Sequence, residues 1–210
     1  MFKKDLELIE LFPTAIHKVS IPEHVETVRK ASFNAQVLEQ PKHELYPVIM
    51  SADITYDELV FDFAKSVIQT AYDILVDQGY DMNGKQTQFD SMWMQEHHKF
   101  SGMEQHIHNN GTQLVGFYFL DVPENSSHLT LHDPRYGKIQ LDMMEKNPSV
   151  PSHATSLVHF IPKVGDLFFT NAWLPHSFSR HGSDEPLRFV HINISVKNVE
   201  QQVCEAPTIV

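Results

Sequence analysis

The sequence predicts a mainly β protein with flanking α-helices, in which an antiparallel sandwich or barrel is backed by helices on one face. Two observations lead to this fold class. Two segments with helical signals occupy the first part of the chain, and short apolar runs separated by Pro, Gly and Asn follow from about residue 87. The chain has neither repeats nor low-complexity tracts. The order of helices first and strands later favours one layered unit.

Length and composition are those of an ordinary globular domain. The chain has 210 residues and a mass of 24.2 kDa, with 41% hydrophobic and 20% charged residues. We expect a single domain over residues 1–210. It comprises an N-terminal strand and supporting helices (1–86), a β core (87–196) and a tail (197–210).

Charge and cysteine content exclude several classes of protein. The formal charge of −11 argues against nucleic acid as the main partner, because a phosphate backbone requires a clustered basic surface. No stretch approaches the roughly 20 apolar residues of a membrane span, and the N-terminus lacks the apolar region of a signal peptide. We expect a soluble, cytoplasmic protein, and a homo-oligomer is compatible with the sequence. Cys204 is the only cysteine, so any metal must be held by histidine or carboxylate.

The first helix is expected after an entry strand. Leu6–Val19 has partial alternation and is broken at Pro13. Ser20-Ile21-Pro22-Glu23 has a capping residue, an early proline and a glutamate three positions on, which predicts a helix that continues to about Leu38.

The second helix has the clearer signals. Thr55-Tyr56-Asp57-Glu58 matches a capping box, and Gly79 supplies a stop. Between them, apolar residues recur at helical spacing and form a predicted core stripe: Leu59, Val60, Phe63, Val67, Ala71 and Ile74.

The rest of the chain predicts nine strands and one long loop. The loop is Glu145–His153, which contains Pro148 and Pro151. The expected strands are 88–95, 103–108, 113–120, 128–132, 138–141, 156–160, 166–170, 176–179 and 188–196.

Three histidines form the candidate metal site. His106 and His108 are two residues apart, so on an extended strand both point to the same side and can bind one ion. They precede the turn Asn109-Asn110-Gly111, which places them at a strand end, where a sheet often presents function. His176, after Trp173-Leu174-Pro175, is the candidate third ligand. Taken alone, each signal also fits incidental histidines in a chain that has 14 of them.

Arg188 lies twelve residues after His176, within the apolar run Leu187-Arg188-Phe189-Val190. An arginine in such a run either faces solvent or is held inside by an anion. Its planar guanidinium suits a carboxylate, which it can bind through two hydrogen bonds.

These motifs resemble the iron and 2-oxoglutarate dioxygenase superfamily, most closely its small oxygenases related to prolyl hydroxylases. The resemblance covers about residues 90–196. It comprises His106-Ile107-His108, Gly116-Phe117-Tyr118-Phe119-Leu120, Asp133-Pro134-Arg135, Gly165-Asp166-Leu167, Trp173-Leu174-Pro175-His176, and Arg188 with Asn193-Ile194-Ser195. The resemblance implies a double-stranded β-helix (a jelly-roll or cupin-like core) with Fe(II) at one open end.

Site roles follow from the resemblance residue by residue. It implies that His106 and His176 bind iron, that Arg188 binds the far carboxylate of 2-oxoglutarate, and that Tyr118 hydrogen-bonds the same co-substrate. Tyr118 is equally well explained as an aromatic core residue. No catalytic side chain is expected beyond the metal centre, and O2 is the third reactant.

The chain departs from the family pattern at one ligand. Where the superfamily usually has a carboxylate, this chain has His108, so the ligands would be three neutral imidazoles. Glu104 shares strand parity with both histidines and is an alternative ligand, although it would lie roughly 14 Å from His108 along the strand. Asp133 is a weaker alternative.

Several other residues near these motifs are interpreted as structural or left open. Arg135 could anchor an acidic substrate or close a turn, and the second reading is slightly favoured. Of His97 and His98, at most one can line the mouth of the site, because adjacent strand residues point oppositely. Asp166 is expected to serve the turn that Gly165 begins.

The leading functional hypothesis is an iron- and 2-oxoglutarate-dependent hydroxylase that acts on a C–H bond of a small molecule or peptide. The alternative from the same ligand set is a cupin-like three-histidine metalloprotein, a dioxygenase or isomerase that does not use 2-oxoglutarate. A third class, a structural or carbohydrate-binding β-sandwich, would bind no metal.

Overall fold

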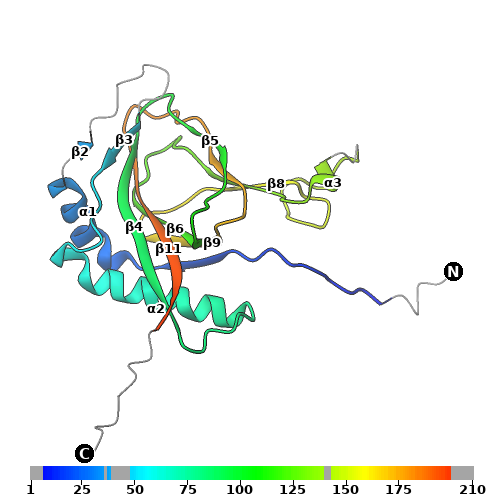
Figure 1. The fold of residues 1–210 in the computed structure, drawn as a ribbon. Helices are drawn as coiled ribbons and strands as arrows, with labels where there is room; N and C mark the ends of the chain where they lie inside the picture. The colour runs from blue at the N-terminus through cyan, green and yellow to red at the C-terminus, as the bar shows by residue number, and fades with distance from the viewer. Residues whose placement is uncertain (1–6, 36, 39–47, 140–142, 200–210) are drawn as a thin grey trace, which may run out of the picture.

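A computed structural model describes residues 7–35, 37–38, 48–139 and 143–199. The strands form two antiparallel sheets that pack face to face, and helices cover the outer face of the larger sheet (Figure 1). In the described part of the chain, no helix is long and apolar enough to cross a membrane.

The larger sheet has seven strands and the smaller sheet has four. The order in the larger sheet is β1 (His17–Ser20), β9 (Asp166–Asn171), β6 (Thr112–Asp121), β11 (Leu187–Asn198), β4 (Lys85–His97), β3 (Val48–Ser51) and β2 (Val37–Leu38). The order in the smaller sheet is β5 (Met103–His106), β10 (His176–Phe178), β7 (Leu129–His132) and β8 (Leu157–Phe160). The chain from β4 to β11 passes repeatedly between the two sheets, which is the arrangement of a double-stranded β-helix. The fold class expected from the sequence is therefore confirmed.

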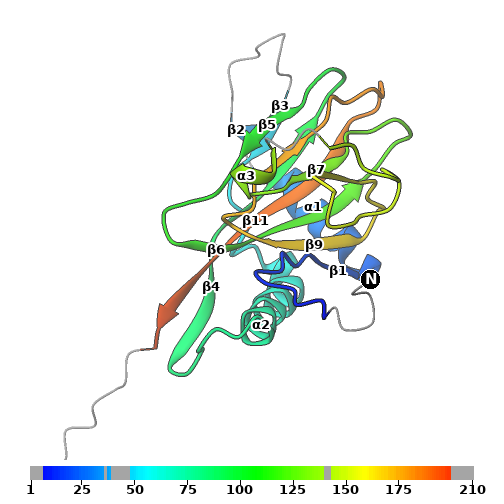
Figure 2. The same ribbon diagram turned by 90° about the vertical axis from the view of Figure 1, so that its right-hand side faces the viewer.

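Strand β11 lies at the centre of the larger sheet. It pairs with β4 along its whole length and with β6 over most of it, and β4 and β11 extend beyond the other strands as a two-stranded ribbon (Figure 2). Because successive side chains of a strand point to opposite faces, β11 contributes to both sides of the sheet. Val190, Ile192 and Ile194 pack toward the helices, and Leu187 and Phe189 pack toward the smaller sheet.

The two helices lie on the outer face of the larger sheet. A short 3₁₀ turn, Pro22–His24, leads into α1 (Val25–Asn34), and a second turn, Glu58–Val60, leads into α2 (Phe61–Asp77). Within α2 the expected stripe residues Phe63, Val67, Ala71 and Ile74 are buried, whereas Leu59 and Val60 precede the helix in the 3₁₀ turn and Leu59 is half-buried. Gly79, with φ +88°, follows the end of the helix. Helix propensity alone is a weak determinant, so this buried face is what holds α2 in place.

Both helix starts differ from expectation. No side chain caps the first turn, where Ile21 is the N-cap and Pro22 occupies the first turn. Asp57, rather than Thr55, caps the second, because its carboxylate accepts a hydrogen bond from the Leu59 backbone N–H at 2.9 Å. Aspartate is as good a cap as threonine, so the capping-box pattern located the helix and misassigned its cap by two residues.

Several predicted bounds are wrong. α1 ends at Asn34 rather than near Leu38, because residues 37–38 form strand β2. The expected entry strand is reduced to β1, and the residues from Glu7 to Ile16 have no regular secondary structure. The expected strand at 138–141 is wrong where the structure describes it: Tyr136–Ile139 is a helical turn, and residues 140–141 lie outside the described residues. The Asp133 carboxylate begins this turn by accepting from the Arg135 backbone N–H at 3.0 Å.

The space between the sheets is filled mainly by aromatic side chains. Phe178 and Phe189 stack with ring centroids 4.5 Å apart, and Phe117 meets Phe178 edge to face at 5.6 Å. Such pairs contribute about 0.5–1.5 kcal/mol each beyond the area they bury. This cluster gives the barrel a rigid interior immediately beside the end of β10 at which His176 lies.

His97 is a histidine inside this aromatic core. It is fully buried, and its ring meets Phe178 and Phe189 edge to face at 5.3 and 5.2 Å. Its Nε2 lies 3.3 Å from Gln95 Oε1. Burial lowers the pKa of His97 to about 3, and the neighbouring His181 adds to the shift, so the ring is neutral at physiological pH.

Gly165 lies in close contact with the N-terminal segment at Pro22. Its φ is +83°, and a Cβ added there would lie 2.8 Å from Pro22 Cα. Substituting Gly165→Ala combines backbone strain with a steric clash, so we expect a loss of about 3 kcal/mol in unfolding free energy by urea denaturation. The control is Gly84→Ala, where φ is +65° but nothing lies within 4 Å, and which should cost about 1 kcal/mol. Equal losses would contradict this account of the contact.

His97 also makes stability depend on pH. Its pKa is about 3 when folded and near 6.5 when unfolded, so as pH falls the unfolded chain takes up the proton first. The contribution of His97 to unfolding free energy should decrease below about pH 6.5 by about 1.4 kcal/mol per pH unit. Urea denaturation at pH 7, 6 and 5 should show a shallower dependence for His97→Gln than for the original chain. His153→Gln, at an exposed position, should leave the dependence unchanged.

Candidate metal centre

The three predicted histidines come together at one end of the barrel. His106 ends β5, His176 begins β10, and these two residues face each other in the antiparallel register. His108 follows two residues later, and its backbone N–H donates to the Ala172 carbonyl at 2.9 Å. The ring centroids of His106 and His176 are 4.4 Å apart, and that of His108 lies 5.2 Å from each.

Nitrogen atoms of the three rings converge as metal binding requires. One ring nitrogen of each histidine lies within 4.8 Å of the others. His106 Nδ1 lies 2.7 Å from the Glu104 carbonyl oxygen, and His176 Nδ1 lies 3.0 Å from that of Leu174. A carbonyl can only accept, so each Nδ1 carries the hydrogen and each Nε2 keeps a lone pair. This arrangement fixes the tautomer that binds a metal through Nε2.

Two buried atoms lack partners until an ion is considered. Nε2 of His108 and Nε2 of His176 are buried and accept no hydrogen bond in the described structure. A buried polar atom without a partner is costly, and a divalent cation would satisfy both at once. The donor set therefore fits a metal that accepts imidazole, such as iron, zinc, copper or nickel.

Lowered pKa values keep the His108 and His176 rings in the neutral form that can bind a cation. Burial lowers the pKa of His108 to about 4, and the neighbouring His106 adds to the shift. Burial also lowers the pKa of His176 to about 3, although its bond to the Leu174 carbonyl acts in the opposite direction. Both rings are neutral at pH 7, which is the form that coordinates metal.

Neither alternative carboxylate joins the cluster. Among the described side chains, the group that could hold an ion consists of His106, His108 and His176. The Asp133 carboxylate instead binds the guanidinium of Arg135 and the ammonium of Lys138. Glu104 contributes its backbone carbonyl, which orients the His106 ring. Among the described residues, the candidate ligands are therefore the three imidazoles.

Arg188 does not lie with the histidines. Its guanidinium binds Glu96 and, at 3.2 Å, Asp121, and it lies over the Phe33 ring of α1 at 5.2 Å. The spacing of twelve residues from His176 matches the family pattern. The strand parity does not fit a position beside the histidines, because Arg188 shares the helix-facing side of β11 with Val190. The described structure therefore does not place Arg188 beside the three histidines, and its role in binding the co-substrate stays a prediction.

Tyr118 also lies on the helix side of the sheet. Its hydroxyl donates to the Ile21 carbonyl at 2.8 Å, and its ring packs against Phe63 of α2 at 4.6 Å. Tyr118 is thus part of the core between sheet and helices, which is the alternative explanation that the sequence left open.

Side chains on the other face of the larger sheet, opposite to Arg188 and Tyr118, surround the metal centre. His191 stacks on His108 at 5.0 Å, and Trp93 of β4 stacks on His191 at 4.4 Å. Asn193, two residues further along β11, counteracts the lowered pKa of His108 through its side chain. The sequence motifs assign no role to these three residues, although Asn193 belongs to the run Asn193-Ile194-Ser195 that resembles the family. The available signal was strand parity, because His191 and Asn193 alternate with the apolar residues that face the helices.

The remaining candidates have structural roles. His98 pairs with Glu96 at 2.6 Å, and His97 lies in the aromatic core, so neither joins the three histidines. Asp166 accepts from the Lys163 backbone N–H at 2.9 Å and pairs with Lys18 at 2.7 Å, which confirms its role in the turn.

Together, the two packed sheets and the three-histidine centre define a double-stranded β-helix protein able to bind a metal ion. Residues 91–192 match a family described as "Putative 2OG-Fe(II) oxygenase". The match includes all three histidines and confirms the resemblance to iron and 2-oxoglutarate oxygenases. No curated protein sequence matches the chain.

Solved structures support the same fold. A prolyl-4-hydroxylase from Pseudomonas putida is similar with a TM-score of 0.59 and 8% identity, covering 87% of this chain and 92% of that one. HygX from Streptomyces hygroscopicus, solved with nickel, 2-oxoglutarate and hygromycin B, has a TM-score of 0.56 and 11% identity, covering 87% and 83%. The epimerase SnoN, solved with Fe³⁺, α-ketoglutarate and nogalamycin RO, has a TM-score of 0.57 and 15% identity, covering 93% and 86%. At these identities, the structures establish the fold.

Loss of one histidine should remove the metal. We expect His176→Ala to lower Fe(II) or Co(II) affinity by at least about 100-fold, because changes that only disturb a ligand's hydrogen-bond partner already cost 10–100-fold. The matched control is His159→Ala, a histidine of β8 that bonds Thr130 and lies outside the cluster. Competition titration against a chelator measures both affinities. Equal affinity of the two variants would contradict the assignment.

Proposed function

We propose that this protein is an oxygenase that uses Fe(II), 2-oxoglutarate and O2, with His106, His108 and His176 as the iron ligands. The observation that carries the proposal is the convergence of three imidazoles, two of which, His106 and His176, have their tautomers set by backbone carbonyls. The family match over residues 91–192 supports iron and 2-oxoglutarate in particular. When bound, iron supplies oxidative chemistry in which 2-oxoglutarate is converted to succinate and CO2 while a C–H bond of the substrate is oxidised.

The protein's part in this chemistry is to orient the bound reactants and to shield the metal centre from water. Three ligands leave open coordination positions for a 2-oxoacid and O2. The rings of Phe117 and His191 pack around His176 and His108 and exclude water from one side of the centre. A dry site strengthens the interactions of charged ligands within it.

We propose hydroxylation of a small molecule or a peptide as the reaction. The structural neighbours include a prolyl-4-hydroxylase and two α-ketoglutarate-dependent enzymes, an epimerase and a carbocyclase, so proteins of this fold differ in the reaction they are named for. Hydroxylation needs no further group from the protein beyond the metal ligands.

A cupin-like metalloprotein that does not use 2-oxoglutarate is the second candidate. The position of Arg188 favours it, because the guanidinium lies on the far side of the larger sheet and is bound by Glu96 and Asp121. The family match favours the oxygenase. The two candidates differ in whether a 2-oxoacid binds the metal.

Anaerobic spectroscopy separates them. Fe(II) is added to the metal-free protein without O2, followed by 2-oxoglutarate, and the visible metal-to-ligand charge-transfer band is recorded. The proposal predicts that the band forms with one 2-oxoglutarate per iron and is lost in His176→Ala. A fully iron-loaded protein that shows no band would exclude the oxygenase and leave the cupin-like candidate.

A further inference from the structure

The three candidate ligands are not held in the same way. The rings of His106 and His176 are each held through Nδ1 by a backbone carbonyl, at 2.7 and 3.0 Å. The ring of His108 has no such bond in the described structure, and its Nε2 is buried without a partner. Two ligands are thus oriented by the main chain, and the third depends on the side chains around it.

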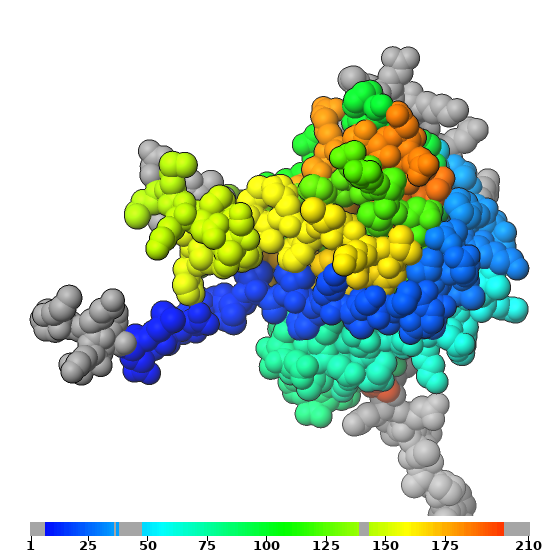
Figure 3. All heavy atoms as spheres, turned by 180° about the vertical axis from the view of Figure 1, so that it is seen from behind, coloured from blue at the N-terminus to red at the C-terminus, as the bar shows by residue number. Residues whose placement is uncertain are grey.

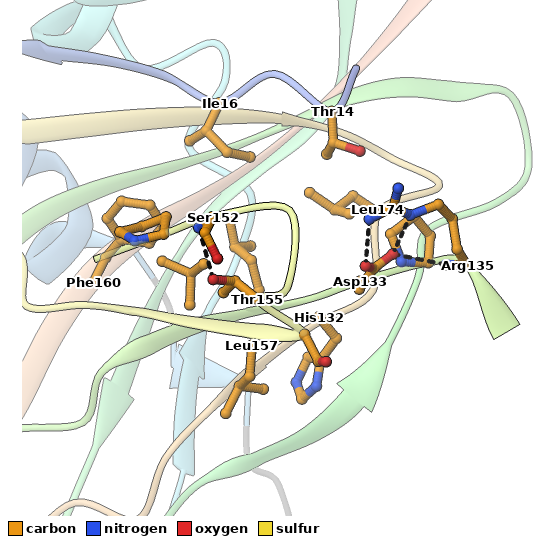
Figure 4. Close-up of a pocket in the computed structure, with 15 residues that line it drawn as sticks. Thr14, Ile16, His132, Asp133, Arg135, Ser152, Thr155, Leu157, Phe160 and Leu174 are labelled. Atoms are coloured by element: carbon orange, nitrogen blue, oxygen red, sulfur yellow. Dashed lines mark hydrogen bonds and ion pairs between the residues drawn. The ribbon is translucent and has the colours of Figure 1, made fainter. Parts of the chain in front are cut away.

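The cavity between the smaller sheet and the N-terminal segment does not include these ligands. Figure 4 shows the side chain of Leu174 in its lining, whereas none of the three histidines is among the lining residues. The N-terminal segment borders the cavity, and Figure 3 shows this segment between α2 and the region of β8. The side chains beyond the cluster that contact His108 belong instead to β11, in the larger sheet.

His191 of β11 packs on the ring of His108. The two ring centroids are 5.0 Å apart with an interplanar angle of 27°, and the His176 ring stacks on the His108 ring at 5.2 Å and 13°. Trp93 faces His191 directly across the β4–β11 pair and stacks on it at 4.4 Å. Phe117 meets the His191 ring edge to face at 5.0 Å. The His191 ring is therefore buried and fixed by aromatic contacts before it meets His108.

Asn193 contacts the His108 ring from the same strand. It follows His191 by two residues, so both side chains point to the same face of β11. The Asn193 side chain hydrogen-bonds with His108, which raises the pKa of that ring against the effect of burial. Its Oδ1 is buried and has no other partner in the described structure, and its Nδ2 lies 3.4 Å from Ser91 Oγ. An amide oxygen can only accept, so its partner on His108 is a ring N–H.

We propose that His191 and Asn193 are positioning residues for the third metal ligand. His191 fixes the plane of the His108 ring, and Asn193 accepts from its Nδ1–H, which leaves Nε2 for the ion. The inference rests on the three-histidine site of the proposed function and adds the residues that complete it. Because β11 is paired on both sides within the larger sheet, the third ligand depends on the contact between the two sheets.

Zinc binding tests whether His191 holds His108. The full-length protein is prepared with isotope-labelled histidine and one equivalent of Zn(II), and long-range proton–nitrogen NMR spectra show which ring nitrogens bind the metal. We expect His191→Ala to lower Zn(II) affinity by about tenfold or more, measured against a chelator, and to release the His108 ring from the metal. His191→Phe keeps a flat ring that can stack, so it should retain the affinity and all three zinc-bound histidines.

A matched pair of variants tests Asn193. Asn193→Ala removes the acceptor, so we expect about a tenfold loss of Zn(II) affinity. In the metal-free protein, the nitrogen signals of His108 should then report a mixture of the two neutral tautomers. Asn193→Asp keeps an oxygen acceptor at the same place and should restore the single tautomer.

A double-mutant cycle separates positioning from a general loss of structure. In a His108→Ala background, His191→Ala and Asn193→Ala should lower the remaining affinity little, because the ring that they hold is gone. The control is His181→Ala, which removes another buried histidine, bonded to the Glu185 carbonyl, and should leave the affinity unchanged. Thermal unfolding shows whether each variant is folded.

Three results would decide against the inference. It is overturned if the losses are as large in the His108→Ala background as in the original chain, or if His191→Ala and Asn193→Ala keep the original affinity. It is also overturned if His191→Phe and Asn193→Asp lose as much as the alanine variants. If the original protein binds Zn(II) through fewer than three histidines, the ligand set of the proposed function itself fails, and this outcome is distinct from the others.

Discussion

The antiparallel pairing of β5 with β10 is the constraint on which the site depends. It places His106 opposite His176, although a long stretch of chain separates them. The strands themselves are short, so the pairing is secured by the neighbours of β10, which include β7 and the aromatic core around Phe178. The metal centre is therefore a product of tertiary packing. Its ligands are oriented by backbone carbonyls that the strand geometry fixes, so the main chain determines which ring nitrogen meets the ion.

The two faces of the larger sheet have separate tasks. One face packs against α1 and α2 and contains the ion pairs of Arg188 and the hydrogen bond of Tyr118. The other face provides the aromatic core and the stacked rings of Trp93 and His191 beside the metal centre. A residue's parity on β11 decides which task it has. The larger sheet thus lies between the metal-site residues and the helices.

The sequence was sufficient for the fold class, the second helix and all three histidines, since each has a local pattern with a direct geometric meaning. The i, i+2 spacing of His106 and His108 is one such pattern. It did not indicate the orientation of Arg188, because spacing along the chain does not reveal which way a strand side chain points when its neighbours are apolar on both faces. His191 was missed for the same reason. The helical turn at Tyr136–Ile139 depends on the hydrogen bond from the Arg135 backbone to Asp133, which no periodicity reports.

Sequence changes in the N-terminal segment can alter a cavity without changing the three histidines. Thr14 and Ile16 line a cavity together with Leu131 and Leu174, two neighbours of His176, yet they lie outside residues 91–192, where the family pattern is recognised. The residues that hold the ion and some of those that shape the adjoining space are thus encoded far apart in the gene. Mutations in the segment before β1 can reshape that space while the three histidines remain under separate selection. Ligand preference and metal chemistry are in this sense free to evolve at different rates.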